Sequence, residues 1–292
     1  MKEINLLKSI PNKKRNIHLR KKLKNLKTIE IANKFGKDYF DGKRSYGYGG
    51  YYYDGRWKNV AKEFGKQTYW EGSYKEALDE GGARQSESAN VSFSWYCGWE
   101  ELSPFIYDLV REHFGLAEDM DVHGDLTVLL PGVGNDSMIV DMYDDGFTKL
   151  SAFDYAPAAI ECCKTILGEE RLVDVTLNVA DARNLREIYQ TKYFDVVIDK
   201  GTLDSIYLIG KTDKSAKRSN VVKSIKEFTR ITNSGGLLVC VTAVATDVIG
   251  DVLEEEDSVW EKVVDTRNGV FMTCDGFASI NIDATLLVYK KR

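Results

Sequence analysis

Two glycines and one aspartate have the spacing of a nucleoside-binding site. Gly132 and Gly134 follow an apolar run at 126–130, and Asp154 comes 20 residues after Gly134, at the end of a second apolar run at 150–153. Glycines after the first strand of an open α/β sheet let the backbone approach a ligand closely, and an acid at the tip of the second strand accepts both ribose hydroxyls. The spacing therefore predicts that this region binds a nucleoside.

The glycine turn lacks the third glycine of a dinucleotide site. Met138 stands where that glycine would let a pyrophosphate sit at the helix N-terminus. S-Adenosyl-L-methionine carries no phosphate, so it requires only the close turn and the acid. We therefore expect S-adenosyl-L-methionine as the cofactor, with S-adenosyl-L-homocysteine as the product.

Apolar runs and helix-forming segments alternate along this part of the chain. Strands are expected at 126–130, 150–153, 173–179, 193–199 and 237–242, and helices at about 136–145, 156–168 and 217–232. Continuous apolar runs are typical of parallel strands that are covered on both faces, and ligands lie outside the carboxyl ends of such strands. Asp181 follows the third run, where its carboxylate and the backbone N–H of Ala182 can pair with an adenine edge.

Several of these stretches resemble the class I methyltransferases, and within them the eukaryotic methyltransferase-like group that includes elongation-factor-1A lysine methyltransferases. Residues 130–137 resemble the G-C-G-N-S turn of that group, with Val133 in place of the cysteine, and residues 153–156 resemble its D-x-S segment. The most specific match is F-D-V-V-I-D-K-G-T-L-D at 194–204. Tyr69-Trp70 and Trp95-Tyr96 resemble its Y-W and W-Y elements. The likeness covers roughly residues 66–292 and leaves an unusual N-terminal extension.

The resemblance implies a fold and a set of cofactor contacts. It implies an α/β, Rossmann-like class I methyltransferase with a mostly parallel seven-stranded sheet, helices on both faces and an N-terminal extension. Together with the strand tips, it places the cofactor against these residues: Pro131, Gly132, Gly134, Asn135, Asp154, Tyr155, Asp181, Ala182, Asp199 and Trp70.

Methyl transfer to an amine requires alignment and a neutral nucleophile. Alignment alone can supply ~7–11 kcal/mol, and carboxylates or hydroxyls can position the amine and take its proton. Asp199, at the tip of the fourth expected strand, is the natural candidate beside the methyl group. Asp204 and Tyr207 follow on the loop expected after it, and they complete the set of candidate catalytic residues.

The N-terminal part of the chain differs in composition from the rest. Residues 1–27 hold ten Lys or Arg and one acid, a charge of +9, so the total of -5 leaves about -14 for the remainder. We expect a mobile basic arm at 1–30, a Tyr/Gly-rich segment at 31–64 and the methyltransferase domain at 65–292. The Tyr/Gly-rich segment is either a lid over the site or a structural wrap. As a lid it would hold a cationic amine through cation–π contacts, and the expected substrate-binding residues are Tyr46, Tyr48, Tyr51, Trp57 and Trp95.

Composition disfavours several other classes of protein. The chain has no run of 18 apolar residues, so no membrane span is expected, and the acidic remainder argues against a nucleic-acid partner. Its five cysteines show no zinc spacing, so no metal is expected. Their odd number indicates reduced thiols and a cytoplasmic protein, and organelle import through the basic N-terminus is the alternative.

The leading hypothesis is N-methylation of a protein lysine that uses S-adenosyl-L-methionine, because the D-K-G-T-L-D stretch resembles that group. One alternative is a small-molecule amine, thiol or carboxylate methyltransferase with a Tyr-rich lid. A second alternative is a catalytically silent, nucleoside-binding Rossmann-like module. The methyl acceptor is accordingly either a protein or a small molecule.

Overall fold

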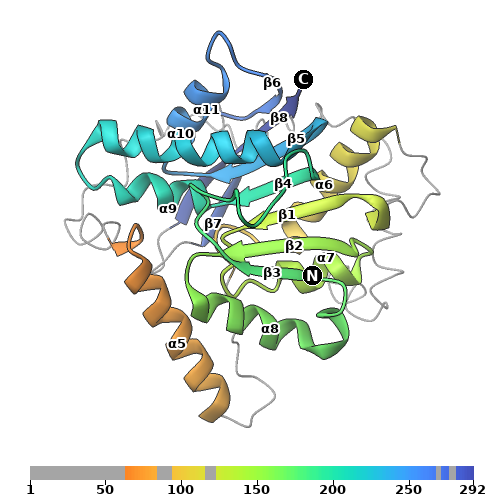
Figure 1. Cartoon of the computed structure of the whole chain (residues 1–292), viewed down its shortest axis with the longest axis vertical. Helices are drawn as coiled ribbons and strands as arrows, with labels where there is room; N and C mark the ends of the chain where they lie inside the picture. Colours follow the sequence, from red (N-terminus) through yellow and green to blue (C-terminus); the bar gives the residue numbers. More distant parts are fainter. Residues whose placement is uncertain (1–62, 84–93, 116–122, 268–270, 276–280) are drawn as a thin grey trace, which may run out of the picture.

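The computed structural model describes residues 63–83, 94–115, 123–267, 271–275 and 281–292. An eight-stranded sheet forms the central layer of the described structure (Figure 1). Seven strands follow one path and β7 (Met272–Asp275) pairs with β8. The path is β3 (Thr176–Val179), β2 (Lys149–Asp154), β1 (Thr127–Pro131), β4 (Phe194–Lys200), β5 (Thr232–Thr242), β8 (Asn281–Lys291) and β6 (Trp260–Asp265).

The strand directions make this sheet mostly parallel. The five strands from β3 to β5 pair in parallel, whereas β8 runs antiparallel to both β5 and β6. The strand order reverses at β1, which lies between β2 and β4, and ligands of open α/β sheets bind at such a switch point. The predicted mostly parallel sheet of seven strands is confirmed for the seven strands on this path, and β7 adds an eighth strand beside β8.

Helices cover both faces of the sheet. One hydrophobic core packs α6 (Trp99–Phe114), α7 (Met138–Asp144) and α8 (Pro157–Arg171) on one face. A second core packs α9 (Thr202–Ile209), α10 (Lys214–Ile231) and α11 (Thr246–Leu253) on the other. The first described helix, α5 (Gln67–Ala83), packs against α8 at the edge of the domain and is drawn in orange in Figure 1. A short 3₁₀ helix, η1 (His123–Asp125), precedes β1.

The two cores follow from the alternation of side chains along each strand. Val128 and Leu130 of β1 belong to the core of α6, α7 and α8, whereas Leu129 between them belongs to the core of α9, α10 and α11. Successive side chains of a strand point to opposite faces of the sheet. Since both faces are covered, both sets are apolar, which explains the continuous apolar runs in the sequence.

The boundaries of several elements differ from those expected. β3 begins at Thr176, whereas a strand was expected from residue 173, and β5 begins at Thr232, five residues before the expected start. Residues 202–209 form α9, where a loop was expected. Leu203 and Ile206 of this helix are buried in the second core, and the N–H of Leu203 donates to the Asp199 carboxylate, 3.2 Å away. Burial and this hydrogen bond stabilise a helix that is too short to show periodicity in the sequence.

Two further observations bear on the class of protein. No helix among the described residues is both long enough and apolar enough to cross a membrane. Four cysteines, Cys97, Cys162, Cys163 and Cys240, are buried free thiols.

Candidate functional site

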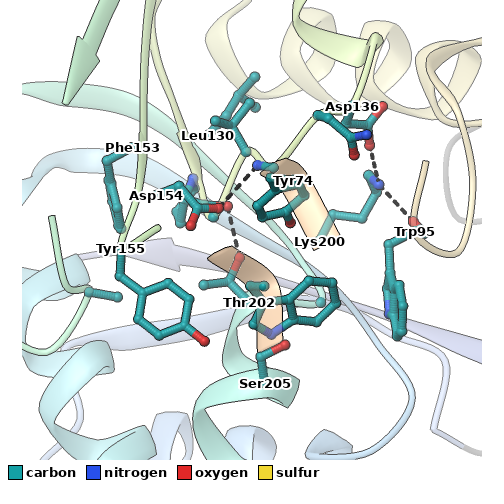
Figure 2. Close-up of a pocket in the computed structure, with 18 of the residues that line it drawn as sticks. Tyr74, Trp95, Leu130, Asp136, Phe153, Asp154, Tyr155, Lys200, Thr202 and Ser205 are labelled. Carbon is teal, nitrogen blue, oxygen red and sulfur yellow. Dashed lines mark hydrogen bonds and ion pairs between the residues drawn. The ribbon is translucent and has the colours of Figure 1, made fainter. Parts of the chain in front are cut away.

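A cavity of about 330 Å³ lies at the carboxyl ends of β1, β2 and β4 (Figure 2). Its volume falls in the range of small-molecule sites, about 300–1,000 Å³. Residues after β3, the start of α9 and one side of α5 complete the wall. The cavity therefore lies where an open α/β sheet binds its ligand.

The glycine turn between β1 and α7 forms the floor of this cavity. Gly132 and Gly134 have φ angles of +56° and +58°, a left-handed conformation that side chains disfavour. A Cβ at Gly132 would lie 2.9 Å from Cγ2 of Thr202, and a Cβ at Gly134 would lie 2.7 Å from the Tyr74 hydroxyl. The turn therefore requires glycine both for its backbone angles and for the close approach of its neighbours.

Asp154, the last residue of β2, holds its carboxylate beside the glycine turn. The residue is 3% exposed, and its carboxylate accepts hydrogen bonds from the N–H of Gly134 at 3.1 Å and of Ala156 at 2.9 Å. Burial raises the pKa of this carboxyl to about 6, against the opposing effect of the backbone hydrogen bonds. Asp154 lines the cavity, so its carboxylate can receive further hydrogen bonds from a ligand.

Among the other residues expected to contact the cofactor, all but Asp199 line the cavity. Asp181 lines it, but its carboxylate is also paired with Arg183 at 2.5 Å, and hydrogen bonds from Arg183 lower the pKa of Asp181 although burial acts in the opposite direction. The remaining lining residues from the expected set are Pro131, Gly132, Gly134, Asn135, Tyr155, Ala182 and Trp70. Asp199 is absent from the described lining.

Asp199 lies on the far side of β4 from the cavity. It is fully buried, and its carboxylate accepts the N–H of Leu203 in the first turn of α9. Burial, and next the charge of Asp204, raise its pKa well above the usual value. The expectation that Asp199 lies beside the methyl group therefore differs from the geometry, because alternation along β4 turns Asp199 away and turns Lys200 toward the cavity.

The other two expected catalytic residues also lie away from the described lining. The Asp204 carboxylate accepts hydrogen bonds from the Tyr96 hydroxyl at 2.6 Å, from the Thr242 hydroxyl at 2.7 Å and from backbone N–H groups at 243–245. It thereby ties α9 to the loop after β5. Tyr207 packs under Lys217, whose Nζ lies 4.4 Å from the ring centroid. These contacts give both residues a structural position within α9.

The expected substrate-binding residues are only partly described. Trp95 lines the cavity. Tyr46, Tyr48, Tyr51 and Trp57, and the boundaries of the basic arm and of the Tyr/Gly-rich segment, lie outside the described residues.

Helix α5 carries an aromatic wall across the cavity. Tyr69, Trp70 and Tyr74 all line it, and Trp70 stacks on Tyr74 with ring centroids 5.9 Å apart. The helix is attached to α8 by Glu71, whose carboxylate accepts the N–H of Ala158 at 3.0 Å. Because that N–H belongs to the first turn of α8 and has no partner within the helix, Glu71 both caps α8 and fixes α5.

A buried ion pair forms the opposite wall. Lys200 Nζ donates to the Asp136 carboxylate and to the Trp95 carbonyl, each at 2.6 Å, and the two charged side chains are only 8% and 10% exposed. Asp136 also accepts the Ser94 hydroxyl and the N–H of Met138. Figure 2 shows this group on the side of the cavity opposite Asp154 and Tyr155. The network joins the glycine turn, the tip of β4 and the segment that carries Trp95.

Several residues that line the cavity had no expected role in the sequence. Lys200 stands inside the D-K-G-T-L-D stretch and Asp136 ends the glycine turn, so both were visible as motif members without a role. Tyr74 lies one helical turn after Trp70, a spacing that places two residues on one side of a helix. Polar and aromatic lining residues that had no expected role include Tyr69, Tyr74, Asp136, Lys200, Thr202 and Ser205.

The arrangement suits a bound nucleoside beside an enclosed reaction space. The Asp154 carboxylate lies at one end, and aromatic rings with a neutralised ion pair lie at the other. Aromatic and aliphatic side chains line much of this space, and an apolar lining favours the neutral form of an amine that enters. The described residues offer no group of three His, Cys, Asp or Glu arranged to hold a metal ion.

Comparisons with known proteins agree with this geometry. A family model described as a methyltransferase domain matches residues 123–283. The chain is 30% identical over 168 residues to EEF1A lysine methyltransferase 2 of Danio rerio, which covers 58% of this chain and 65% of that protein. The human protein of the same name is 28% identical over 172 residues, with 59% and 66% covered. An eEF1A lysine and N-terminal methyltransferase homolog of Drosophila melanogaster is 25% identical over 193 residues, with 66% and 24% covered. The chain thus spans just under two thirds of the first two relatives.

Proposed function

We propose that this chain, which belongs to the methyltransferase domain family, methylates the side-chain amine of a protein lysine. One observation carries the acceptor class: the relatives that match more than half of the chain are named as lysine methyltransferases that act on elongation factor 1A. The first acceptor to test is therefore elongation factor 1A from the organism that encodes this chain.

S-Adenosyl-L-methionine is the cofactor, and the residues of the cavity fit it. The left-handed turn at Gly132 and Gly134 leaves no room for a Cβ, and the Asp154 carboxylate is fixed beside it. Asp154 would bind the ribose hydroxyls, and Tyr155, Asp181 and Ala182 would surround the base. When bound, the cofactor supplies an electrophilic methyl group.

The protein's own side chains prepare the acceptor. A lysine amine must lose its proton before it can act as a nucleophile, and removal from water lowers the pKa of an ammonium group. Rings on α5 and Trp95 create such an environment at one end of the cavity. The hydroxyl of Ser205, in the first turns of α9, lines the same cavity and can orient the amine by a hydrogen bond.

The acceptor class is tested by methyl transfer from tritiated S-adenosyl-L-methionine. The purified chain is incubated with elongation factor 1A, with the same protein after chemical blocking of its lysines, and with the small-molecule fraction of a lysate. We expect label in the untreated protein and no label after lysine blocking. The variant Asp154→Asn, measured beside the wild type, reports whether the label depends on this cavity.

The other outcomes separate the alternatives. Label confined to the small-molecule fraction would support the small-molecule methyltransferase with its lid. Binding of S-adenosyl-L-homocysteine without label in any fraction would support a silent nucleoside-binding module. Label that persists on lysine-blocked protein would contradict lysine as the acceptor.

A further inference from the structure

Three aromatic rings from two separate elements enclose one end of the cavity. Tyr69 and Trp70 come from α5 and Trp95 comes from the segment before α6. The Trp70 ring is nearly perpendicular to both others, at 85° to Tyr69 with centroids 5.2 Å apart and at 76° to Trp95 with centroids 5.7 Å apart. Perpendicular rings present faces and edges in different directions, so the three form a corner and not a flat stack.

Each tryptophan is held in place by its own contacts. The indole Nε1 of Trp70 donates to the Phe64 carbonyl at 2.7 Å. The Trp95 carbonyl accepts from Lys200, and its indole lies so close to Gly201 that a Cβ there would come within 2.8 Å of the ring. Trp95 thus packs on the residue that follows β4. A rigid wall at the tip of that strand is suited to recognise a group of fixed shape.

The charge of the cavity lining does not oppose a cation. Its charged side chains in the described lining are Asp136, Asp154, Asp181 and Lys200, and the Asp181 carboxylate is paired with Arg183. Lys200 is neutralised by Asp136 at 2.6 Å, so its charge does not repel an incoming cation strongly. A cation over an aromatic face gains about 0.5–1 kcal/mol at exposed sites and about 2 kcal/mol where water is excluded.

We propose that Tyr69, Trp70 and Trp95 form a binding site for the alkylammonium group of a methylated lysine. This inference rests on the proposed function, which supplies the lysine. When the amine nitrogen uses its lone pair to form the new N–C bond, the departing sulfur keeps the electron pair of the broken C–S bond and the nitrogen becomes cationic. The rings stabilise that charge and retain the methylated side chain beside the transfer site. Each further methyl transfer to the same lysine then begins when the ammonium group releases one N–H proton to water.

The proposal is tested by binding, without turnover. The probes are Nα-acetyl-Nε-trimethyl-lysine methylamide and its neutral analogue, in which carbon replaces the charged nitrogen and the shape is kept. Affinities are measured by NMR titration of the full chain, with and without S-adenosyl-L-homocysteine. We expect the charged probe to bind roughly five- to thirtyfold more tightly than the neutral one.

Variants test whether the aromatic rings cause the preference for the charged probe over the neutral one. Trp95→Leu should reduce the ratio of the two affinities to less than about twofold, because the aromatic face of the Trp95 indole is lost. Tyr193→Leu is the matched control and should leave the preference unchanged. This tyrosine is 49% exposed just before β4, at the opposite end of that strand from the cavity. If Trp95→Leu does not fold, Tyr69→Leu replaces it, because Tyr69 is half-buried on the surface helix α5.

Three results would overturn the aromatic site. These are equal affinities for the two probes, no binding of either probe, and an undiminished preference in the folded Trp95 or Tyr69 variant. The affinity for S-adenosyl-L-homocysteine is measured in the same samples. Loss of that affinity would contradict the proposed function, whereas the comparison of charged and neutral probes would still report on the rings.

Discussion

The carboxylate of Asp154 accepts a hydrogen bond from the backbone N–H of Gly134, 3.1 Å away and 20 residues earlier in the chain. This contact joins the tip of β2 to the glycine turn after β1. The N–H of Ala156 fixes the other carboxylate oxygen at 2.9 Å. The acid is therefore oriented before any ligand arrives, and a bound ribose would not need to order it.

Replacement of this acid should weaken cofactor binding. In Asp154→Asn the charge-assisted hydrogen bonds to the ribose are lost, and such bonds contribute about 1.5–3 kcal/mol. Titration calorimetry with S-adenosyl-L-homocysteine measures the change. Asp174→Asn is the control, because Asp174 is exposed before β3 and its side chain bonds only to the Tyr143 hydroxyl among the described hydrogen bonds. An unchanged affinity in Asp154→Asn would remove the acid from the ribose site.

The same carboxyl predicts how binding depends on pH. Burial raises the pKa of the Asp154 carboxyl from 3.8 to about 6 in the ligand-free fold. The protonated carboxyl therefore contributes to the stability of the fold below about pH 4, and this contribution is lost as pH rises through about 6. Ribose hydroxyls donate to the ionised form, so the affinity for S-adenosyl-L-homocysteine should rise roughly tenfold from about pH 5 to about pH 7.5. Calorimetry at the two pH values measures this rise, which should vanish in Asp154→Asn. A wild-type affinity independent of pH would contradict the assignment.

The role of the glycine turn can be tested by comparing alanine substitutions at two glycines that both have a positive φ angle. Gly132→Ala combines strain at φ +56° with a clash against Thr202, whereas Gly235→Ala combines strain at φ +80° with open space. Backbone strain should lower the unfolding free energy of each variant by about 1 kcal/mol or more. Only Gly132→Ala should also lose affinity for S-adenosyl-L-homocysteine. Equal affinities in the two variants would show that the turn does not contact the cofactor.

The sequence predicted those strands and helices whose residues follow a clear local pattern. The apolar runs predicted the order of β1 to β5, and Pro157 suits the first turn of α8 as proline does at the start of a helix. Strands β6 to β8 and helix α11 were not predicted. In β6 the exposed Glu261 and Lys262 interrupt the apolar pattern, because this strand lies at the edge of the sheet.

The candidate site was predicted where backbone shape determined it and missed where packing determined it. Gly132 and Asp154 belong to a turn and a strand tip whose neighbours are set by the fold class. Asp199 and Lys200 are adjacent in sequence, yet they point to opposite faces of β4. Which face opens to the cavity depends on α5 and Trp95. Both lie more than 100 residues earlier in the chain, so they could not be placed beside β4 from the sequence.

Asp199 has a defined structural role that can be separated from catalysis. Asp199→Asn keeps an acceptor for the N–H of Leu203 and removes the unfavourable proximity to Asp204, so unfolding free energy and turnover should stay close to those of the wild type. Asp199→Ala leaves that N–H without its partner and should cost about 1–3 kcal/mol of stability. Thermal melts and initial rates measure both variants. A loss of turnover of ~100-fold or more in the folded Asn variant would instead support a catalytic acid at this position.

The predicted basic arm and Tyr/Gly-rich segment can be tested by truncation. Deletion of residues 1–30 should leave the fold and the affinity for S-adenosyl-L-homocysteine unchanged, because a lysine-rich stretch can bury little apolar surface. Deletion of residues 1–60 should lower turnover at unchanged cofactor affinity if the Tyr/Gly-rich segment is a lid. Full activity and full stability after the longer deletion would contradict both a lid and a wrap.

The central claim is that this cavity transfers a methyl group to a protein lysine. It is tested most directly by incubating the purified chain with S-adenosyl-L-methionine and elongation factor 1A, and by locating the modification with tandem mass spectrometry. We predict methyl groups on the Nε atom of a lysine, at a level that falls sharply with Asp154→Asn and is unchanged with Asp174→Asn. Unmodified lysines after incubation with a wild-type chain that binds S-adenosyl-L-homocysteine would contradict the claim.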